Sequence, residues 1–352
     1  MLMLDSFFGL FSHELGIDLG TSNTRVLVKD KGIMVREPSV VVRQKKTKEI
    51  IDLGSEAKKM IGKTPVNLEV VKPLHDGVIA DFDATVAMLS HYLKQVHQSG
   101  RLIPMIPKPK VVASIPSGVT GVERKAVQDA LLLAGARMVD LIEEPMAAAI
   151  GADLKVAESQ GILLVNIGGG VTDMAVISLG GIVQGRTLKI AGEEMTAAVG
   201  NFLRLKYSLL VGELTAEEVK IEIGSALQVG KNEDKSFIVR GRGLETGLPV
   251  SLKVQASEIR EALAPIVNQI VLAVSELVES TPPELMTDIS KAGICLCGGG
   301  AKLMGLDRLI FETTKIPAWV AENPLDCTVK GCGQLLVKEK LLKKVKVTGG
   351  LK

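Results

Sequence analysis

Two turns of small residues are the parts of this sequence best suited to chemistry. Residues 15–28 and 164–176 align without a gap, so that Asp18 lies over Asn166 and Thr24 over Thr172. In each stretch an apolar run, a tight turn and a second apolar run predict a β-hairpin. Glycine and short hydroxyl residues at a turn leave backbone N–H groups accessible to an anion. Two such hairpins predict two similar halves that face one phosphate chain.

A third turn of small residues follows the apolar segment 292–297. It contains Gly298, Gly299, Gly300 and Ala301. A buried strand, a glycine turn and then a helix would place free amides and the positive end of a helix dipole beside a nucleotide. A run of three glycines can also be a simple loop. Because all three turns end apolar strands, shared nucleotide binding is the better interpretation.

Carboxylates at a predicted strand-to-helix junction are the next candidates. Glu143 and Glu144 precede Pro145, which suits the first turn of a helix. Burying two acids at such a junction costs free energy, and a catalytic function would explain why they are there. Both are therefore catalytic candidates. The alternative is that they only complement the helix N-terminus. Farther along, a helix expected to open at Thr215 carries Glu217 and Lys220 one turn apart, which by itself indicates an ordinary surface ion pair.

Alternating helices and strands must position these groups. A Thr cap with Glu at the capping-box position predicts a helix that opens at Thr120. The other expected helices cover residues 84–97, 143–150, 257–280 and 283–290, and the other strands 111–116, 138–142, 236–242, 249–254 and 292–297. At 352 residues, two domains are expected.

Composition excludes several classes of function. A net charge of +2 and only 3% aromatic residues give no support for nucleic-acid binding. Cys295, Cys297, Cys327 and Cys332 match no zinc-binding pattern and no disulfide framework, which favours a reduced, cytosolic chain. No apolar run approaches the roughly 20 residues of a membrane-spanning helix.

Two apolar segments nevertheless suggest contact with a membrane surface. On a helix, one face of residues 1–13 would carry Leu4, Phe7, Phe8 and Phe11, which is typical of an amphipathic interfacial helix. Docking on the protein core is the alternative. Prolines make residues 101–110 a loop, and this loop carries Leu102, Ile103, Met105 and Ile106 between basic residues. Together the two segments favour a peripheral membrane contact.

Several stretches give the chain a resemblance to a known family. They are residues 17–23, 32–42, 76–82, 141–151, 167–170, 215–226 and 282–301. The chain resembles the actin, Hsp70 and sugar-kinase superfamily, and within it the MreB family of bacterial actin-like shape-determining proteins. The resemblance implies an α/β, actin-like (ribonuclease H-like, duplicated) two-lobed ATPase fold, each lobe a large and a small subdomain. It also implies ATP and Mg²⁺ in the cleft, and self-assembly into filaments on the inner face of the cytoplasmic membrane that organise the cell-wall elongation machinery.

The resemblance also implies roles for single residues. Asp18 would hold Mg²⁺ through water. The phosphates would be cradled by Gly20, Thr21, Ser22 and Asn23 from one lobe and by Gly168, Gly169 and Gly170 from the other. Glu217 and Lys220 would flank ribose and adenine, and Gly298 to Ala301 would lie under the nucleoside. Glu144 would position the attacking water with Thr172 as its partner.

At the second hairpin the sequence departs from this family. The usual pattern has Asp before the glycines and Thr-Thr after them, whereas this chain has Asn166 and Val171. Ala191 and Glu193 also stand where Gly and Asp are common. Asparagine can still accept a hydrogen bond from a metal-bound water, but it lacks the negative charge that helps to hold Mg²⁺. We therefore expect nucleotide binding with slow hydrolysis, in which Asn166 remains a catalytic-site residue.

The resemblance also divides the chain. The expected parts are an amphipathic helix (1–12), subdomain IA (13–34, 75–158 and 324–347), subdomain IB (35–74), subdomain IIA (159–190 and 254–323) and subdomain IIB (191–253). A small-molecule kinase of the same superfamily is the alternative function, although no other segment offers a polar substrate pocket. An Hsp70-type chaperone would need a further substrate-binding domain after the two lobes.

Overall fold

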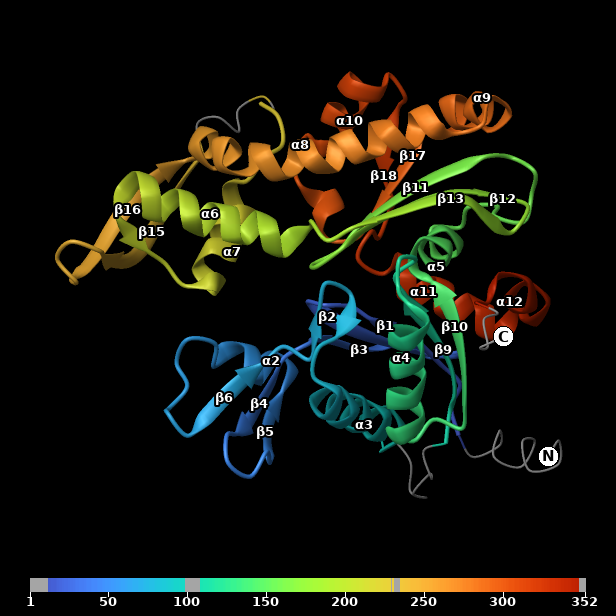
Figure 1. The fold of residues 1–352 in the computed structure, drawn as a ribbon, viewed down its shortest axis with the longest axis horizontal. Coiled ribbons are helices and arrows are strands. Elements are labelled where there is room, and N and C mark those ends of the chain that lie inside the picture. Colours follow the sequence, from blue (N-terminus) through green and yellow to red (C-terminus); the bar gives the residue numbers. More distant parts are fainter. Residues whose placement is uncertain (1–11, 99–107, 229, 231–234, 348–352) are drawn as a thin grey trace.

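The computed structural model describes residues 12–98, 108–228, 230 and 235–347. In it the chain forms two lobes, one above the other in Figure 1. The lower lobe contains a five-stranded sheet of order β10-β9-β1-β2-β3, and the upper lobe a five-stranded sheet of order β13-β12-β11-β17-β18. These strands are β1 (Leu15–Leu19), β2 (Asn23–Val28), β3 (Gly32–Pro38), β9 (Lys110–Ile115), β10 (Met138–Glu143), β11 (Ile162–Ile167), β12 (Thr172–Ser178), β13 (Gly181–Leu188), β17 (Ile294–Cys297) and β18 (Ala318–Val320).

The two large sheets have the same topology. In each, three antiparallel strands come first in the chain, and two later strands add in parallel beside the first of them. The hairpins β1–β2 and β11–β12 pair in matching register, with Leu19 opposite Thr24 and Ile167 opposite Thr172. The predicted hairpins and the two similar halves are therefore confirmed.

Each lobe also carries a small sheet on its outer side. The lower one is β5 (Ile50–Leu53), β4 (Val41–Gln44) and β6 (Leu68–Val71), and the upper one is β14 (Leu209–Leu210), β15 (Ser236–Gly243) and β16 (Pro249–Gln255). A short pair, β7 (Leu74–His75) and β8 (Val78–Ile79), follows the lower sheet. The predicted boundary between residues 34 and 35 falls inside β3. Since β3 pairs with β2, this strand belongs to the large sheet up to Pro38.

Helices cover the sheets and fill the space between the lobes. They are α2 (Gly54–Lys59), α3 (Phe82–Gln98), α4 (Gly121–Leu133), α5 (Glu144–Gly151), α6 (Gly192–Tyr207), α7 (Glu213–Ile223), α8 (Ala256–Ser280), α9 (Pro283–Ala292), α10 (Leu306–Thr314), α11 (Cys327–Val337) and α12 (Glu339–Val345). Thr120 caps α4 with the predicted reciprocal hydrogen bonds to Glu123. The prediction that a helix opens at Thr215 was wrong, because α7 begins two residues earlier after Gly212.

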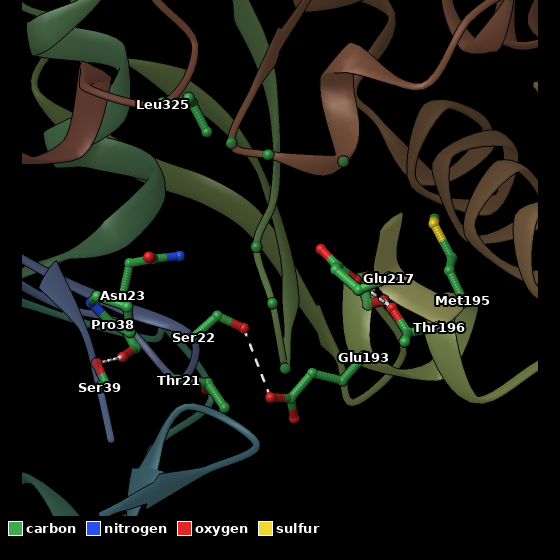
Figure 2. A pocket seen from close by; sticks show the side chains of 18 of the residues that line it. Thr21, Ser22, Asn23, Pro38, Ser39, Glu193, Met195, Thr196, Glu217 and Leu325 are labelled. Carbon is green, nitrogen blue, oxygen red and sulfur yellow. Dashed lines mark hydrogen bonds between the residues drawn. The ribbon is translucent and has the colours of Figure 1, made fainter. Parts of the chain in front are cut away.

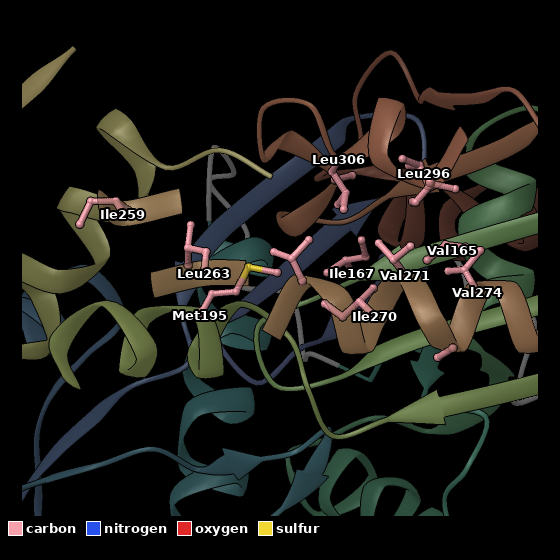
Figure 3. Close-up of a cluster of buried hydrophobic side chains, with 14 of the residues drawn as sticks. Val165, Ile167, Met195, Ile259, Leu263, Ile270, Val271, Val274, Leu296 and Leu306 are labelled. Carbon is pink, nitrogen blue, oxygen red and sulfur yellow. The ribbon is translucent and has the colours of Figure 1, made fainter. Parts of the chain in front are cut away.

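Apolar packing explains the burial of the central strands. All residues of β1 and β12 are buried, as expected for strands covered on both faces. In the upper lobe, α8 lies along the sheet, and Ile270, Val271 and Val274 pack toward Val165 and Leu296 (Figure 3). Among the described residues α8 is the one helix long and apolar enough to span a membrane by length and composition, but its apolar face belongs to this core.

The lobes are joined by two helices in close contact. The chain passes from the lower sheet to the upper one after α5, and it returns into α11, which packs against α5 between the lobes (Figure 1). Gly151 and Gly331 lie at the crossing. A Cβ at Gly151 would lie 1.8 Å from the Cys327 carbonyl oxygen, and one at Gly331 would lie 1.8 Å from the Ala147 carbonyl oxygen. The two backbones therefore touch without intervening side chains.

Candidate nucleotide-binding site

A cavity of about 550 Å³ lies between the lobes. This volume is within the usual range for small-molecule sites. The three predicted turns all contribute to its walls, and the second small subdomain adds residues from α6 and α7 (Figure 2). Of the predicted site residues, those that line it are Asp18, Gly20, Thr21, Ser22, Asn23, Glu144, Asn166, Gly168, Gly169, Gly170, Glu217, Lys220, Gly298, Gly299 and Gly300.

The first hairpin turn is held by hydrogen bonds to its own backbone and to neighbouring loops. Gly20 N–H donates to the Asn23 carbonyl oxygen at 3.2 Å, and the Ser39 hydroxyl donates to the Gly20 carbonyl oxygen at 2.7 Å. The Thr21 hydroxyl accepts from Gly77 N–H at 2.9 Å. These bonds fix the turn before any ligand arrives, which reduces the entropy cost of binding.

The second turn repeats this geometry and meets the first. Gly168 N–H donates to the Val171 carbonyl oxygen at 2.9 Å, which matches the Gly20 bond. A Cβ added at Gly169 would lie 2.0 Å from the Ser22 hydroxyl oxygen, and one at Gly170 would lie 2.7 Å from that of Thr21. The glycines are thus required for the close approach of the lobes. An anion between the turns would face backbone groups from both.

A group of acids and one amide forms the floor of the cavity. Asp18 is buried, and it accepts hydrogen bonds from Ser114 at 3.3 Å and from Arg25 at 3.2 Å. Burial raises the pKa of Asp18 despite the opposing charge of Arg25. The Asn166 amide donates to Glu144 at 3.2 Å. Burial, with the charges of Asp173 and Asp18, raises the pKa of Glu144 well above its usual value. Both carboxylates of the floor therefore lie in surroundings that disfavour their charged forms.

The side chains of the floor suit Mg²⁺ that is bound mainly by phosphate and water. Its carboxylate and amide oxygens are the donor type that this ion prefers, and Mg²⁺ keeps several waters and is held largely by phosphates. Within the described ranges, no group of three or more His, Cys, Asp or Glu side chains is arranged to bind a metal directly. The residues present therefore fit an ion held by phosphate and water, with Asp18 reaching it through a water.

Thr172 occupies a different place from the one expected. Its side chain is fully buried, and its hydroxyl donates to the Ile190 carbonyl oxygen at 2.7 Å instead of lining the cavity. Thr24, its equivalent in the first hairpin, similarly bonds Ser39 at 2.9 Å. Each threonine fastens its hairpin to the segment after the third strand. This geometry supports a structural role for Thr172.

Glu217 and Lys220 belong to a polar cluster on the upper wall. The two side chains form an ion pair at 2.6 Å. Lys220 also donates to the Gly192 carbonyl oxygen and to the Thr196 hydroxyl, each at 2.9 Å, and that hydroxyl bonds Glu217 (Figure 2). Although burial acts in the opposite direction, Lys220 and Thr196 lower the pKa of Glu217. Gly192 N–H in turn donates to Gly168, so the cluster supports the second turn.

The third turn presses against the second hairpin. Gly298 has a φ of +82°, and a Cβ there would lie 2.2 Å from the Ile167 carbonyl oxygen. Gly298, Gly299 and Gly300 line the cavity, whereas Ala301 is buried behind them. The sequence predicted a helix directly after this turn. Instead, a short 3-10 turn (Gly300–Lys302) comes first, and α10 begins at Leu306.

Several residues of the cavity were missed at the sequence level. Arg25 lines the floor, and Lys72 reaches from the lower small subdomain to Glu213 at 2.6 Å and to Glu193 at 3.3 Å. The Ser22 hydroxyl also bonds Glu193 at 3.5 Å (Figure 2). A signal for Arg25 was present, because the hairpin register places it opposite Asp18. The contacts of Lys72 join residues far apart in sequence, and no local pattern indicates them.

Eight residues were predicted to contact a membrane surface. Leu4, Phe7, Phe8, Phe11, Leu102, Ile103, Met105 and Ile106 all lie outside the described residues.

Comparison with known proteins identifies the family. A family model described as MreB/Mbl protein matches residues 12–344. The chain belongs to the MreB/Mbl family. Cell shape-determining protein MreB of Escherichia coli (strain K12) is 48% identical over 338 residues, which cover 95% of this chain and 96% of that protein. Cell shape-determining protein Mbl of Bacillus subtilis (strain 168) is 42% identical over 327 residues, which cover 93% and 96%.

Solved structures agree with the MreB/Mbl assignment. MreB5 of Spiroplasma citri bound to ADP superposes with a TM-score of 0.87 at 36% identity, covering 95% of this chain and 98% of that one. The same protein bound to AMPPNP gives the same score. A MamK double helical filament, at 21% identity and a TM-score of 0.75, covers 93% of this chain and 99% of that one and shows the shared fold alone. The actin-like, two-lobed α/β fold is confirmed.

Proposed function

We propose that this chain is an ATP-binding bacterial actin homologue that polymerises into filaments at the inner face of the cell membrane and organises cell-wall elongation to set rod shape. The observation that carries the nucleotide part is the contact of two duplicated glycine turns in the cavity between the lobes. The MreB5 structures bound to ADP and AMPPNP support the same part, and two relatives named as cell shape-determining proteins support the role in cell shape. The small-molecule kinase alternative receives no support from these relatives.

Within this proposal each wall of the cavity has a task. The turns at Gly20–Asn23 and Gly168–Gly170 would hold the phosphates with backbone N–H groups. The Glu217–Lys220 cluster and the Gly298–Gly300 turn would flank the nucleoside. Asp18 would hold a water of the Mg²⁺ shell, and the ion would supply charge compensation to the phosphates.

Hydrolysis is proposed to be slow. Glu144 would orient the attacking water, and its pKa is raised by burial and neighbouring acids. Its partner Asn166 supplies an amide where a carboxylate would add charge. Phosphoryl transfer relies on positioning and electrostatic stabilisation, so these two features together reduce the rate.

Phosphate release from the purified chain tests the proposed slow hydrolysis. We expect Asn166→Asp to raise the rate with ATP and Mg²⁺ by about tenfold or more. Asn268→Asp, at an exposed position of α8 that does not line the cavity, adds the same charge and serves as the matched control. An unchanged rate in Asn166→Asp would refute the role given to Asn166.

Sedimentation tests the filament and membrane parts. The purified chain should pellet with liposomes in the presence of ATP. Replacing Phe7 and Phe8 by Ser should abolish lipid-linked pelleting while nucleotide binding persists, because burial of these rings would provide much of the membrane affinity. Equal pelleting of this variant with lipid would contradict the membrane proposal. The Hsp70-type and kinase alternatives predict no such lipid dependence.

A further inference from the structure

His97 lies near the end of α3, where its imidazole ring joins three parts of the lower lobe. The side chain is only 3% exposed. Its Nδ1 donates to the Leu93 carbonyl oxygen of the same helix at 2.6 Å. Its Nε2 accepts from His13 N–H at 3.3 Å and lies 3.2 Å from the Ser12 hydroxyl oxygen. That oxygen in turn accepts from Lys108 N–H at 3.2 Å. We call this set of residues the His97 junction.

The partners of the ring fix its protonation state. A carbonyl oxygen can only accept, so Nδ1 must carry the proton that Leu93 receives. A backbone N–H can only donate, so Nε2 must offer its lone pair to His13. The junction therefore requires a neutral imidazole with its proton on Nδ1. A second proton, on Nε2, would face the His13 N–H and deprive it of its acceptor.

The charged groups beside the junction also oppose a second proton. Lys31, in the turn between β2 and β3, places its ammonium nitrogen 3.1 Å from Nε2 of His13. The rings of His13 and His97 lie 5.3 Å apart, centroid to centroid. Glu14, the acid next to His13, is already paired with Lys29 at 2.6 Å. A charged His97 would therefore be close to a cation without a carboxylate to compensate it.

The remaining neighbours have the same sign of charge. Lys94 on α3 and Lys108 are exposed cations. Burial of the ring and the charge of Lys31 lower the pKa of His97, although its hydrogen bond to the helix carbonyl acts in the opposite direction. The ring is therefore neutral near pH 7 and gains a charge only in acid.

The His97 junction also connects the two segments that were predicted to contact a membrane. Ser12 is the last residue of the predicted interfacial helix (1–12), and Lys108 belongs to the predicted apolar loop (101–110). Ser12 bonds directly to Lys108 and lies against His97. Two weak membrane anchors bind more tightly when their attachment points are held together, because the second then binds at a high effective concentration.

We propose that His97 is a pH-sensitive fastener: its neutral ring holds the attachment points of the two predicted membrane segments together, and protonation of Nε2 releases them and weakens membrane binding. His97 is buried and acts through Ser12 and His13, so its role is one of positioning. The effect on membrane binding rests on the proposed membrane contact, whereas the release of the junction does not.

Hydrogen exchange, resolved to single amides by mass spectrometry, tests the release. Between pH 7.5 and pH 5, after correction for intrinsic exchange rates, protection of the His13 and Lys108 amides should fall by about tenfold, because the released ring takes up a proton that the junction excludes. The amide of Ile17, in the centre of the buried strand β1, reports global stability and is the internal reference.

Two variants assign the effect to one ring. In His97→Gln a side-chain oxygen can still accept from His13, but it takes up no proton in this range, so protection should be retained at pH 5. His91→Gln is the matched control, because His91 is an exposed histidine on the same helix; it should keep the full loss of protection. Circular dichroism and the Tm of each variant establish that it is folded.

Sedimentation with vesicles of phosphatidylcholine and phosphatidylglycerol tests the effect on membrane binding. The natural chain should bind about tenfold more weakly than His97→Gln at pH 5 and equally well at pH 7.5. Comparing the two chains at the same pH cancels the general effect of acid on protein charge, and His91→Gln should behave as the natural chain does.

The outcomes separate this proposal from the membrane contact on which it partly rests. Protection of His13 and Lys108 that is unchanged at pH 5, or that falls equally in the natural chain and in His97→Gln, overturns the fastener. If protection falls as expected but both chains bind vesicles equally at pH 5, the effect on membrane binding is overturned. If the natural chain binds no vesicles at either pH, the membrane contact itself is wrong, and hydrogen exchange still decides the role of His97.

Discussion

The two hairpins of this chain share a backbone geometry but carry different charges at matching positions. In the first, Asp18 faces Arg25 across the strands, and both side chains line the cavity. In the second, Asn166 occupies the position of Asp18, and Asp173 occupies the position of Arg25. Asp173 is fully buried and accepts hydrogen bonds from the backbone of Ser117 at 3.3 Å and from the Thr187 hydroxyl.

This comparison separates what the duplicated scaffold requires from what the chemistry requires. Both turns keep the same backbone hydrogen bond, and both threonines at the start of the second strand fasten the hairpin. Charge is free to differ. The first hairpin presents an ion pair to the ligand, whereas the second uses its acid to hold the lower lobe through Ser117. Substitutions of the buried acid, of the contact between the turns and of the paired threonines test this difference.

The largest expected effect concerns the buried acid of the second hairpin. Burial raises the pKa of Asp173 from 3.8 to about 6. A raised carboxyl pKa means that this group favours the folded state at low pH and loses that contribution as the pH rises through 6. The loss amounts to about 3 kcal/mol by pH 7. In Asp173→Asn the decline in the free energy of unfolding between pH 4 and 7, measured by urea denaturation, should become smaller by about this amount, while the decline due to the raised pKa values of Asp18 and Glu144 remains.

Glu123→Gln serves as the control, because the contribution of Glu123 to stability has the opposite pH dependence. The backbone and side chain of Thr120 lower the pKa of Glu123, so Glu123 contributes stability that is lost as the pH falls. Glu123→Gln should therefore remove an acid-side loss of stability and leave the decline toward pH 7 in place. If Asp173→Asn kept the full decline between pH 4 and 7, the assignment to Asp173 would be wrong.

The next effect tests the contact between the two turns. Gly169→Ala should weaken ATP binding by about tenfold to hundredfold, because its Cβ would overlap Ser22 and force the turns apart. The double variant Gly169→Ala with Ser22→Gly should recover most of the affinity, since the overlapping atoms are gone. Titration of a fluorescent ATP analogue measures both. Equal weakening in the single and double variants would show that overlap with Ser22 is not the cause.

A smaller effect is expected at the paired threonines. Thr172→Val and Thr24→Val should each lower the free energy of unfolding by about 1–2 kcal/mol, because each removes a buried hydrogen bond. If the role of Thr172 is structural, the two variants should also have similar rates of phosphate release. A rate that falls only in Thr172→Val would restore the catalytic role expected from the family resemblance.

The smallest effect lies at the outer edge of the cavity. Lys72 joins the lower small subdomain to Glu213 and Glu193 of the upper lobe, but the lysine is one-third exposed. Partly exposed ion pairs contribute no more than about 1 kcal/mol. Lys72→Met should thus change the dissociation rate of ATP by less than about fivefold, and high salt should abolish the difference. A much larger change in the ATP dissociation rate, measured by stopped flow, would show that Lys72 makes a principal contact holding the two lobes together.

Features with a local cause could be predicted from the sequence. Alternation of apolar runs and small residues gave both hairpins, and the Thr120 cap depends only on a residue three positions away. The Glu217–Lys220 pair likewise follows from helical spacing. The start of α7 was missed because Gly212, without a capping side chain, precedes the more obvious Thr215.

Features with a distant cause could not be predicted in the same way. The direction of the Thr172 hydroxyl depends on Ile190, and the approach of Gly169 to Ser22 depends on how the lobes close. Lys72 finds partners only after two subdomains come together. Arg25 is an intermediate case, since the register of one predicted hairpin was enough to place it beside Asp18.

The bare crossing of α5 and α11 at Gly151 and Gly331 has a mechanical consequence. Because the two main chains are in direct contact there, no side chains can repack to absorb a displacement. We therefore expect the two lobes to move relative to each other by rotation about this crossing. A small rotation that accompanies ligand binding would then produce larger displacements at β5 and β16, because these strands lie far from the crossing. Contacts between neighbouring copies of the chain made at those outer edges would register the ligand most strongly.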